Sequence, residues 1–215
     1  ACSKKINKTY MQGYCYPCFI SLPQTEECVF KPHLCKAHEG KARDMNWAQS
    51  HCLTNTYVYL SLTSNLKVGV TRGNHIPSRW IDQGAHYAIK VAKTPNRYLA
   101  GMIEVELSKH MSDRTKWRQM IQGKYDMIDL TDKKKQFVDL VPNDYQKYIL
   151  ENSDIVKFEY PMNSVPEKIK SFNFDKNHTL SGQLTGIKGQ YIIIDNATVV
   201  NIRKYTGYYF LVNHD

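Results

Sequence analysis

All six cysteines of this chain lie in its first quarter, and this crowding limits what the segment can fold into. They are Cys2, Cys15, Cys18, Cys28, Cys35 and Cys52. Cys15 and Cys18 have the spacing at which two thiolates converge on one tetrahedral ion. Disulfides of a secreted module are the alternative, but nothing resembles a signal peptide. We therefore expect residues 1–52 to be a metal-binding module in a cytoplasmic protein, where thiols stay reduced.

Several ligand sets are compatible with this spacing. Cys2, Cys15 and Cys18 supply three quarters of a zinc ribbon, with a fourth ligand expected two or three residues before Cys2. A second ion would use the later cysteines and one histidine, chosen from His33, His38 and His51. One ion on Cys15, Cys18 and two later cysteines, or an iron–sulfur cluster on four cysteines, stays open. We expect one or two structural zinc ions. Residues 1–52 have few apolar residues in a regular period, so we expect this segment not to fold without metal.

Residues 53–125 show a different pattern, with short runs typical of strands and helices. Residues 57–62 and 66–71 are predicted strands around a turn at 64–65, which makes them an antiparallel hairpin. A short helix is predicted from Pro77 to Gly84, and a third strand over 86–92. Thr94 and Pro95 predict a helix reaching about Met111, and Ser112 a further one. The order is thus β-β-α-β-α-α.

The remainder of the chain divides into a connector and a β-rich end. Residues 126–153 read as a helical connector that Pro142 interrupts. Residues 154–215 hold short alternating runs at 156–160, 172–174, 191–194, 199–202 and 208–212, with glycines between them. This pattern is typical of a small antiparallel barrel or sandwich. The predicted fold class is therefore α+β, with a metal-bound head, a three-stranded centre and a small β domain.

Charge and hydropathy bear on partners. The chain has 29 Lys and Arg against 20 Asp and Glu, a net charge of +9, which favours polyanions and first of all nucleic acid. Apolar runs are far shorter than the ~18 residues of a membrane-spanning helix. We expect nucleic acid, DNA or RNA, as the partner and no membrane.

The central residues resemble a known nuclease superfamily. Tyr57-Val-Tyr59, Lys67-Val-Gly69, Arg79 and the later Glu104 follow the order of the motifs of GIY-YIG nucleases, and the predicted β-β-α-β-α order resembles their fold. This resemblance implies a divalent-metal-dependent endonuclease that hydrolyses phosphodiester bonds. By motif position Tyr59 helps activate a water, Arg79 holds the scissile phosphate and Glu104 binds one Mg²⁺ or Mn²⁺ ion.

The motifs depart from that pattern at two places. Tyr57 stands where the first motif opens with glycine, and Lys67 where the second opens with tyrosine. Tyr57 lies on the same strand face as Tyr59 and is a substitute for it, while Lys67, Arg72 and Arg79 are candidate nucleic-acid contacts. The apolar period of the 94–111 helix would place Glu106 rather than Glu104 toward the core. Glu104 is preferred because its neighbours match the superfamily's pattern.

A second resemblance covers nearly the whole chain. The runs Gly13–Phe19, Leu66–Arg72 and Arg79–Ala85 look like a bacterial family of unassigned function, which brings no activity with it. Three functions follow as hypotheses: a metal-dependent endonuclease, a catalytically inactive zinc-containing module that binds DNA or RNA, and a scaffold that binds protein partners.

Overall fold

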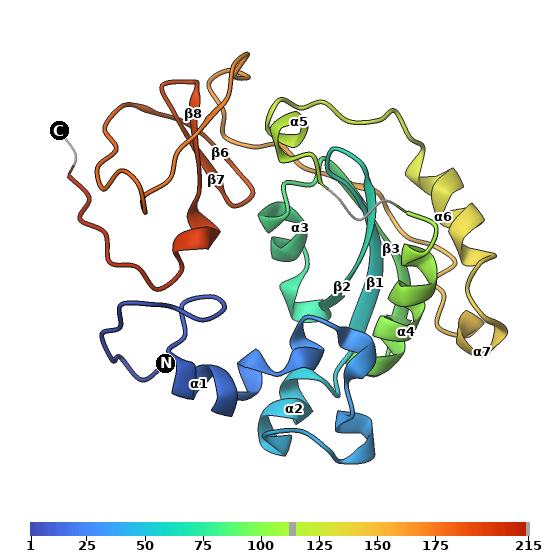
Figure 1. The fold of residues 1–215 in the computed structure, drawn as a ribbon. Coiled ribbons are helices and arrows are strands. Elements are labelled where there is room, and N and C mark those ends of the chain that lie inside the picture. The colour runs from blue at the N-terminus through green and yellow to red at the C-terminus, as the bar shows by residue number, and fades with distance from the viewer. Residues whose placement is uncertain (112–114, 214–215) are drawn as a thin grey trace.

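The centre of the protein is an antiparallel sheet of β-branched and aromatic residues. Its strands are β1 (Thr56–Leu62), β2 (Leu66–Arg72), β3 (Tyr87–Thr94) and β4 (Val156–Lys157), hydrogen-bonded in the order β2-β1-β3-β4. The computed structural model describes residues 1–111 and 115–213 (Figure 1). The predicted hairpin and third strand are confirmed, with β3 running two residues further than expected.

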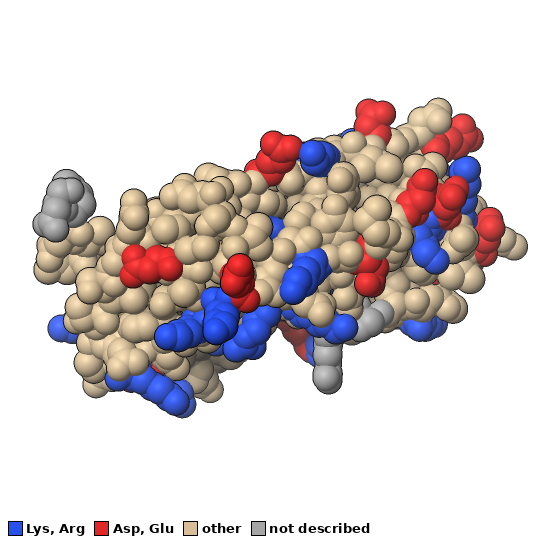
Figure 2. All heavy atoms as spheres, turned by 90° about the horizontal axis from the view of Figure 1, so that it is seen from above, with Lys and Arg blue, Asp and Glu red and all other residues tan. Residues whose placement is uncertain are grey.

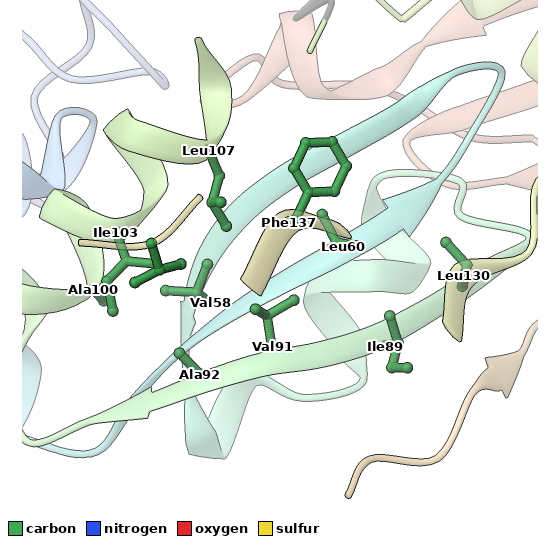
Figure 3. Close-up of a cluster of buried hydrophobic side chains, with 11 residues drawn as sticks. Val58, Leu60, Ile89, Val91, Ala92, Ala100, Ile103, Leu107, Leu130 and Phe137 are labelled. Carbon is green, nitrogen blue, oxygen red and sulfur yellow. The ribbon is translucent and has the colours of Figure 1, made fainter. Parts of the chain in front are cut away.

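Two helices cover one face of this sheet and form the main core. Val58, Leu60, Ile89 and Val91 point from the strands toward α4 (Arg97–Ser108) and α6 (Leu130–Val138), as Figure 3 shows. From the helices, Ala100, Ile103, Leu107, Leu130 and Phe137 meet them. The opposite face carries the short helix α3 (Ser78–Asp82), whose Trp80 packs with Tyr59, Ala85 and Ala88. Alternation along β1 thus sends Tyr59 away from the main core.

Local capping explains where the helices begin. Asn96, not the expected Thr94, caps α4, because its side chain accepts a hydrogen bond from the Leu99 N–H. The chain leaves α3 through Gly84 at φ +72°, the predicted stop. Asp129 caps α6, and α7 (Asn143–Gln146) begins after Pro142, so this stretch is helical with the predicted interruption at Pro142. The helix α5 (Trp117–Ile121) is present, whereas its expected cap, Ser112, lies outside the described residues.

The N-terminal segment has little regular structure. It holds α1 (Tyr16–Ser21) and α2 (Met45–His51), separated by the single 3₁₀ turns η1 (Pro23–Thr25), η2 (Glu27–Val29), η3 (Pro32–Leu34) and η4 (Ala37–Glu39). The small core of this segment consists of Cys28, Cys35 and Cys52 with Ala37 and Ala48. Thiols therefore occupy positions that aliphatic side chains fill elsewhere in the protein.

The C-terminal sheet corrects the expectation of a small antiparallel barrel or sandwich. Its strands are β5 (Lys170–Ser171), β6 (Leu184–Lys188), β7 (Tyr191–Ile194) and β8 (Thr198–Asn201), in the order β5-β8-β7-β6, followed by η6 (Ile202–Tyr205). Within the described residues it is one mixed sheet, because β5 pairs parallel to β8. The run at 208–212 forms no strand and is exposed, and residues 156–157 pair with β3 instead. Alternation shows that a segment is extended but not which neighbour it pairs with.

The three parts of the chain contact one another at close backbone approaches. A Cβ on Gly13 would lie 2.3 Å from the Thr206 carbonyl oxygen, and one on Gly189 would lie 2.9 Å from the Gly84 nitrogen. Figure 1 accordingly shows the N-terminal segment beside the chain that follows β8. Among the described residues no helix has the length and apolar character to cross a membrane.

Lys188 links the C-terminal sheet to the centre and makes stability depend on pH. Its Nζ lies 3.0 Å from Nε2 of His86, and burial lowers the pKa of Lys188 from 10.5 to about 8. Between these values the unfolded chain holds a proton that the folded chain has lost, so stability rises with pH across that window. The rise amounts to roughly 3 kcal/mol.

We expect Lys188→Met to lose this rise, because methionine does not titrate. The test is the melting temperature of both proteins from about pH 7.5 to about pH 10. Exposed Lys204 provides the matched control, Lys204→Met, which should keep the wild-type slope. An unchanged slope in Lys188→Met would contradict the assignment.

Candidate metal centres and active site

Three cysteines of the N-terminal segment form one possible metal site, called here the N-terminal trio. The sulfurs of Cys2, Cys15 and Cys18 all lie within 4.8 Å of one another, and those of Cys2 and Cys15 are 3.6 Å apart. Sulfurs on a tetrahedral zinc ion with bonds of about 2.3 Å are separated by about 3.8 Å. The Lys4 backbone N–H and the neighbouring thiols lower the pKa of Cys2 to about 7, which favours the metal-binding thiolate.

The other three cysteines form a second group, the buried trio. Cys28, Cys35 and Cys52 are 6%, 3% and 1% exposed, and their sulfurs lie within 4.8 Å of one another. Hydrogen bonds from the Cys28 and Cys52 thiols lower the pKa of Cys35 to about 3, while the pKa values of Cys28 and Cys52 are raised, first of all by hydrogen bonds within the trio. A cluster that shares negative charge in this way is suited to a divalent cation.

This grouping decides between the ligand sets that the sequence leaves open. One ion on Cys15, Cys18 and two later cysteines is wrong, since the cysteines separate into two trios, and all six are free thiols. In the described chain neither group of three includes His33, His38 or His51, the candidate fourth ligands. His51 instead bonds the Trp47 carbonyl through Nδ1 at 3.0 Å, and His38 stacks on Tyr98. Each trio therefore fits zinc with three thiolates and one remaining position.

An arginine balances the charge of the buried trio and ties it to α4. Arg97 is 9% exposed, and its Nη1 lies 4.0 Å from Sγ of Cys28. The backbone N–H of the same residue, the first of α4, donates to the Cys52 carbonyl at 2.8 Å. Buried charges persist where they are paired. The trio and the start of α4 thus form one structural unit.

A close approach continues this contact along α4. A Cβ on Gly101 would lie 2.2 Å from the backbone nitrogen of His33, so only glycine lets α4 lie against η3. η3 spans part of the loop between Cys28 and Cys35. The helix that carries Glu104 is therefore positioned by the metal-binding segment as well as by the sheet.

Tyr59 is the residue around which the predicted catalytic groups can be located. Its ring is 1% exposed, its hydroxyl donates to Oε1 of Gln83 at 2.9 Å, and it meets Trp80 edge-on at 5.7 Å between centroids. Burial raises the pKa of Tyr59. The charge of Arg79 and a hydrogen bond from it lower this pKa, and the charge of the Glu104 carboxylate raises it. The charges of Arg79 on α3 and Glu104 on α4 therefore both influence the Tyr59 phenol on β1.

Glu104 and Glu106 have different surroundings on α4. Both oxygens of Glu106 accept hydrogen bonds from Lys109, at 2.8 and 2.7 Å, on the exposed side of the helix. The buried residues of α4 are Ala100, Gly101, Ile103 and Leu107 with Arg97, so the buried face differs from the predicted one, which was expected to place Glu106 toward the core. This difference moves Glu106 outward, and Glu104 acts on Tyr59.

Gln83 is the group in this site that sequence reasoning missed. It lies four residues after Arg79, immediately after the end of α3. A spacing of four residues places both side chains on one face of a helical turn, and this spacing could have identified Gln83 from the sequence. Asp82 lies three residues after Arg79 on the same helix, but within the described residues no ion pair joins the two.

The remaining predicted site residues lie around this group. Lys67 pairs with Ser61 across the hairpin and lies two residues before Gly69, which is opposite Tyr59. Nη2 of Arg72 is 2.7 Å from Nε2 of His75 at the end of β2. Tyr57 is directed elsewhere, with its ring against Gly73 and near the ammonium groups of Lys90 and Lys93.

Gly69 makes room for the Tyr59 phenol. A Cβ at this position would lie 2.6 Å from both Cζ and the hydroxyl oxygen of Tyr59. We expect Gly69→Ala to destabilise the protein by about 1–3 kcal/mol, since the buried ring must move. Urea unfolding measures this. In a Tyr59→Leu background the clash is removed, so the same substitution should cost little. Equal costs in both backgrounds would refute the contact.

Comparison with known proteins identifies a family whose function is unknown. No curated protein and no solved structure matches the chain. A family model described as a protein of unknown function (DUF2797) matches residues 1–210. This match agrees with the expected family of unassigned function, and the chain therefore belongs to the DUF2797 family.

Proposed function

We propose that this protein binds nucleic acid and hydrolyses phosphodiester bonds with the help of a divalent cation. The observation that carries the proposal is the action of Arg79 and Glu104, from separate helices, on the buried Tyr59 phenol. The order β1-β2-α3-β3-α4 agrees with the resemblance to GIY-YIG nucleases. In this proposal the fold serves to hold a phenol, a guanidinium and a carboxylate around one phosphate.

Each residue has a role that its surroundings support. Glu104 offers a half-buried carboxylate, the hard oxygen ligand that Mg²⁺ and Mn²⁺ prefer. A bound ion supplies positive charge at the scissile phosphate. Arg79 holds a phosphate oxygen through its planar donors. Because the pKa of Tyr59 is raised, its phenol is neutral at physiological pH and orients the attacking water by a hydrogen bond.

Charge supports a polyanionic substrate. The net charge is +9, and Figure 2 shows basic side chains gathered over part of one face, with acidic ones more scattered. Positive surface potential raises the rate of encounter with nucleic acid and makes binding depend on salt. Lys67 and Arg72, on the edge strand β2, are the proposed backbone contacts.

The second candidate is a zinc-containing module that binds nucleic acid without turnover. Two observations favour it: Tyr59 is 1% exposed, and Lys67 stands where the nuclease pattern has tyrosine. The two zinc-compatible trios would then serve only to shape the binding surface.

A cleavage assay distinguishes the two. Purified protein is incubated with plasmid, single-stranded DNA and RNA, in Mg²⁺ or Mn²⁺, and in Ca²⁺ as the inactive reference. Fragments in Mg²⁺ or Mn²⁺ alone support the nuclease. Salt-dependent binding without fragments supports the second candidate. Absence of both would end the nucleic-acid proposal.

A further inference from the structure

A pocket lies on the same sheet face as Tyr59, and the proposed chemistry does not use it. Its volume is about 530 Å³, within the usual range of small-ligand pockets. It is lined by Tyr57, Lys90 and Lys93 from the sheet, by Ile76, Pro77 and Trp80 around the start of α3, and by residues of the 150–156 segment. Trp80 forms part of this wall and also touches Tyr59, so the pocket adjoins the candidate active site.

A β-bulge brings two lysines to this pocket. Residues three apart on a strand normally face opposite sides of the sheet. Here Tyr59 pairs with Lys90 and Tyr57 with Lys93, because the register shifts between Val58 and Tyr59. The Nζ atoms of Lys90 and Lys93 lie 5.6 and 6.0 Å from the centre of the Tyr57 ring.

These two cations lack a protein counter-ion. Across residues 1–111 and 115–213, no ion pair includes Lys90 or Lys93, although Asp154 also lines the pocket. Two like charges over one ring repel each other, and an anion between them removes that repulsion. The arrangement is therefore suited to a phosphate.

The rest of the wall is suited to an aromatic base. Trp80 is 1% exposed, and within the part of the chain that the structure describes its indole N–H has no hydrogen-bond acceptor. An unsatisfied buried donor is costly unless a ligand completes it. The partly exposed ring of Tyr57 and the apolar Pro77 offer stacking surface, and Asn152 offers hydrogen bonds.

We infer that this pocket binds one nucleotide, with its phosphate at Lys90 and Lys93 and its base against Tyr57 and Trp80. The inference rests on the proposed function, in that this nucleotide is the neighbour of the one whose phosphate Arg79 holds. A base can enter such a pocket only when it is unpaired. The preferred substrate is therefore single-stranded.

The test is calorimetric titration of the whole protein with nucleoside 5′-monophosphates, and with inorganic phosphate as the reference. Calcium replaces the catalytic ion, so that nothing is cleaved. The double substitution Lys90→Ala with Lys93→Ala is expected to weaken binding at least about tenfold, because charged hydrogen bonds are lost. Exposed Lys168 and Lys176 provide a control pair with the same change of charge outside this pocket, which should bind as wild type does.

The substitution Trp80→Phe separates the contribution of the indole N–H to binding from that of the aromatic ring. It keeps the aromatic wall and removes the N–H, so nucleotide binding should weaken while binding of inorganic phosphate stays unchanged. Two results overturn the inference: phosphate binding as tightly as the nucleotides, or no binding of either. Nucleotide binding by a protein that cuts nothing would leave the pocket standing and end the nuclease. Cleavage of nucleic acid without nucleotide binding would support the nuclease and overturn the nucleotide pocket.

Discussion

If each trio binds zinc, substitution of Cys35 by serine is expected to remove one ion and to unfold the segment around the buried trio. Cys35 is 3% exposed, and few apolar side chains surround it. Structural zinc contributes about 10–16 kcal/mol of apparent binding free energy in small zinc domains. The loss should extend to the start of α4, because the Arg97 N–H donates to the Cys52 carbonyl.

Elemental analysis and hydrogen exchange measure this effect. The wild-type protein should hold one ion per trio, and Cys35→Ser only the ion of the N-terminal trio. Cys18→Ser is the matched substitution, because it removes the other ion and leaves the exchange of α4 amides unchanged. A wild-type protein without zinc or iron would contradict the metal sites altogether.

Substitution of Glu104 by glutamine is expected to abolish metal-dependent cleavage while the fold persists. The amide keeps the shape of the side chain and loses the charge that holds the cation. Loss of one charge-stabilising group in an active site costs about 10²–10³ in rate. Arg79→Ala should lower cleavage by a similar factor, through loss of the phosphate contact.

The chain supplies a matched control two residues away. Glu106→Gln makes the same chemical change on the same helix but breaks only the ion pair with Lys109, which is worth less than about 1 kcal/mol. Its cleavage rate should equal that of wild type. Equal cutting by Glu104→Gln and wild type would show that the fragments come from a contaminating nuclease.

Local patterns in the sequence predict the elements of the centre well. The β1–β2 hairpin, β3 and α4 are marked by alternation, by a short turn and by the 3.6-residue period, all of which are local properties. The helix start shifted from Thr94 to Asn96 because either residue can cap, and the sheet decides where the chain turns. The cysteine spacing likewise predicts metal binding.

Contacts between distant residues are what the sequence does not reveal. The spacing offers the partition of the cysteines into two trios as one of several ligand sets, and how the 3₁₀ turns fold back selects it. The parallel pairing of β5 with β8 is a tertiary choice of the same kind. The approach of both Lys90 and Lys93 to Tyr57 depends on one bulge in β3, and bulges leave little signal in a sequence.

The glycine contact between α4 and η3 has a consequence for regulation. If zinc binding orders α4, then the affinity of Glu104 for its catalytic cation depends on zinc occupancy more than 50 residues earlier in the chain. Linkage makes this reciprocal, so catalytic cation and substrate would tighten the hold on zinc by the same factor. Oxidation of the buried thiols would then weaken the proposed cation site from a distance.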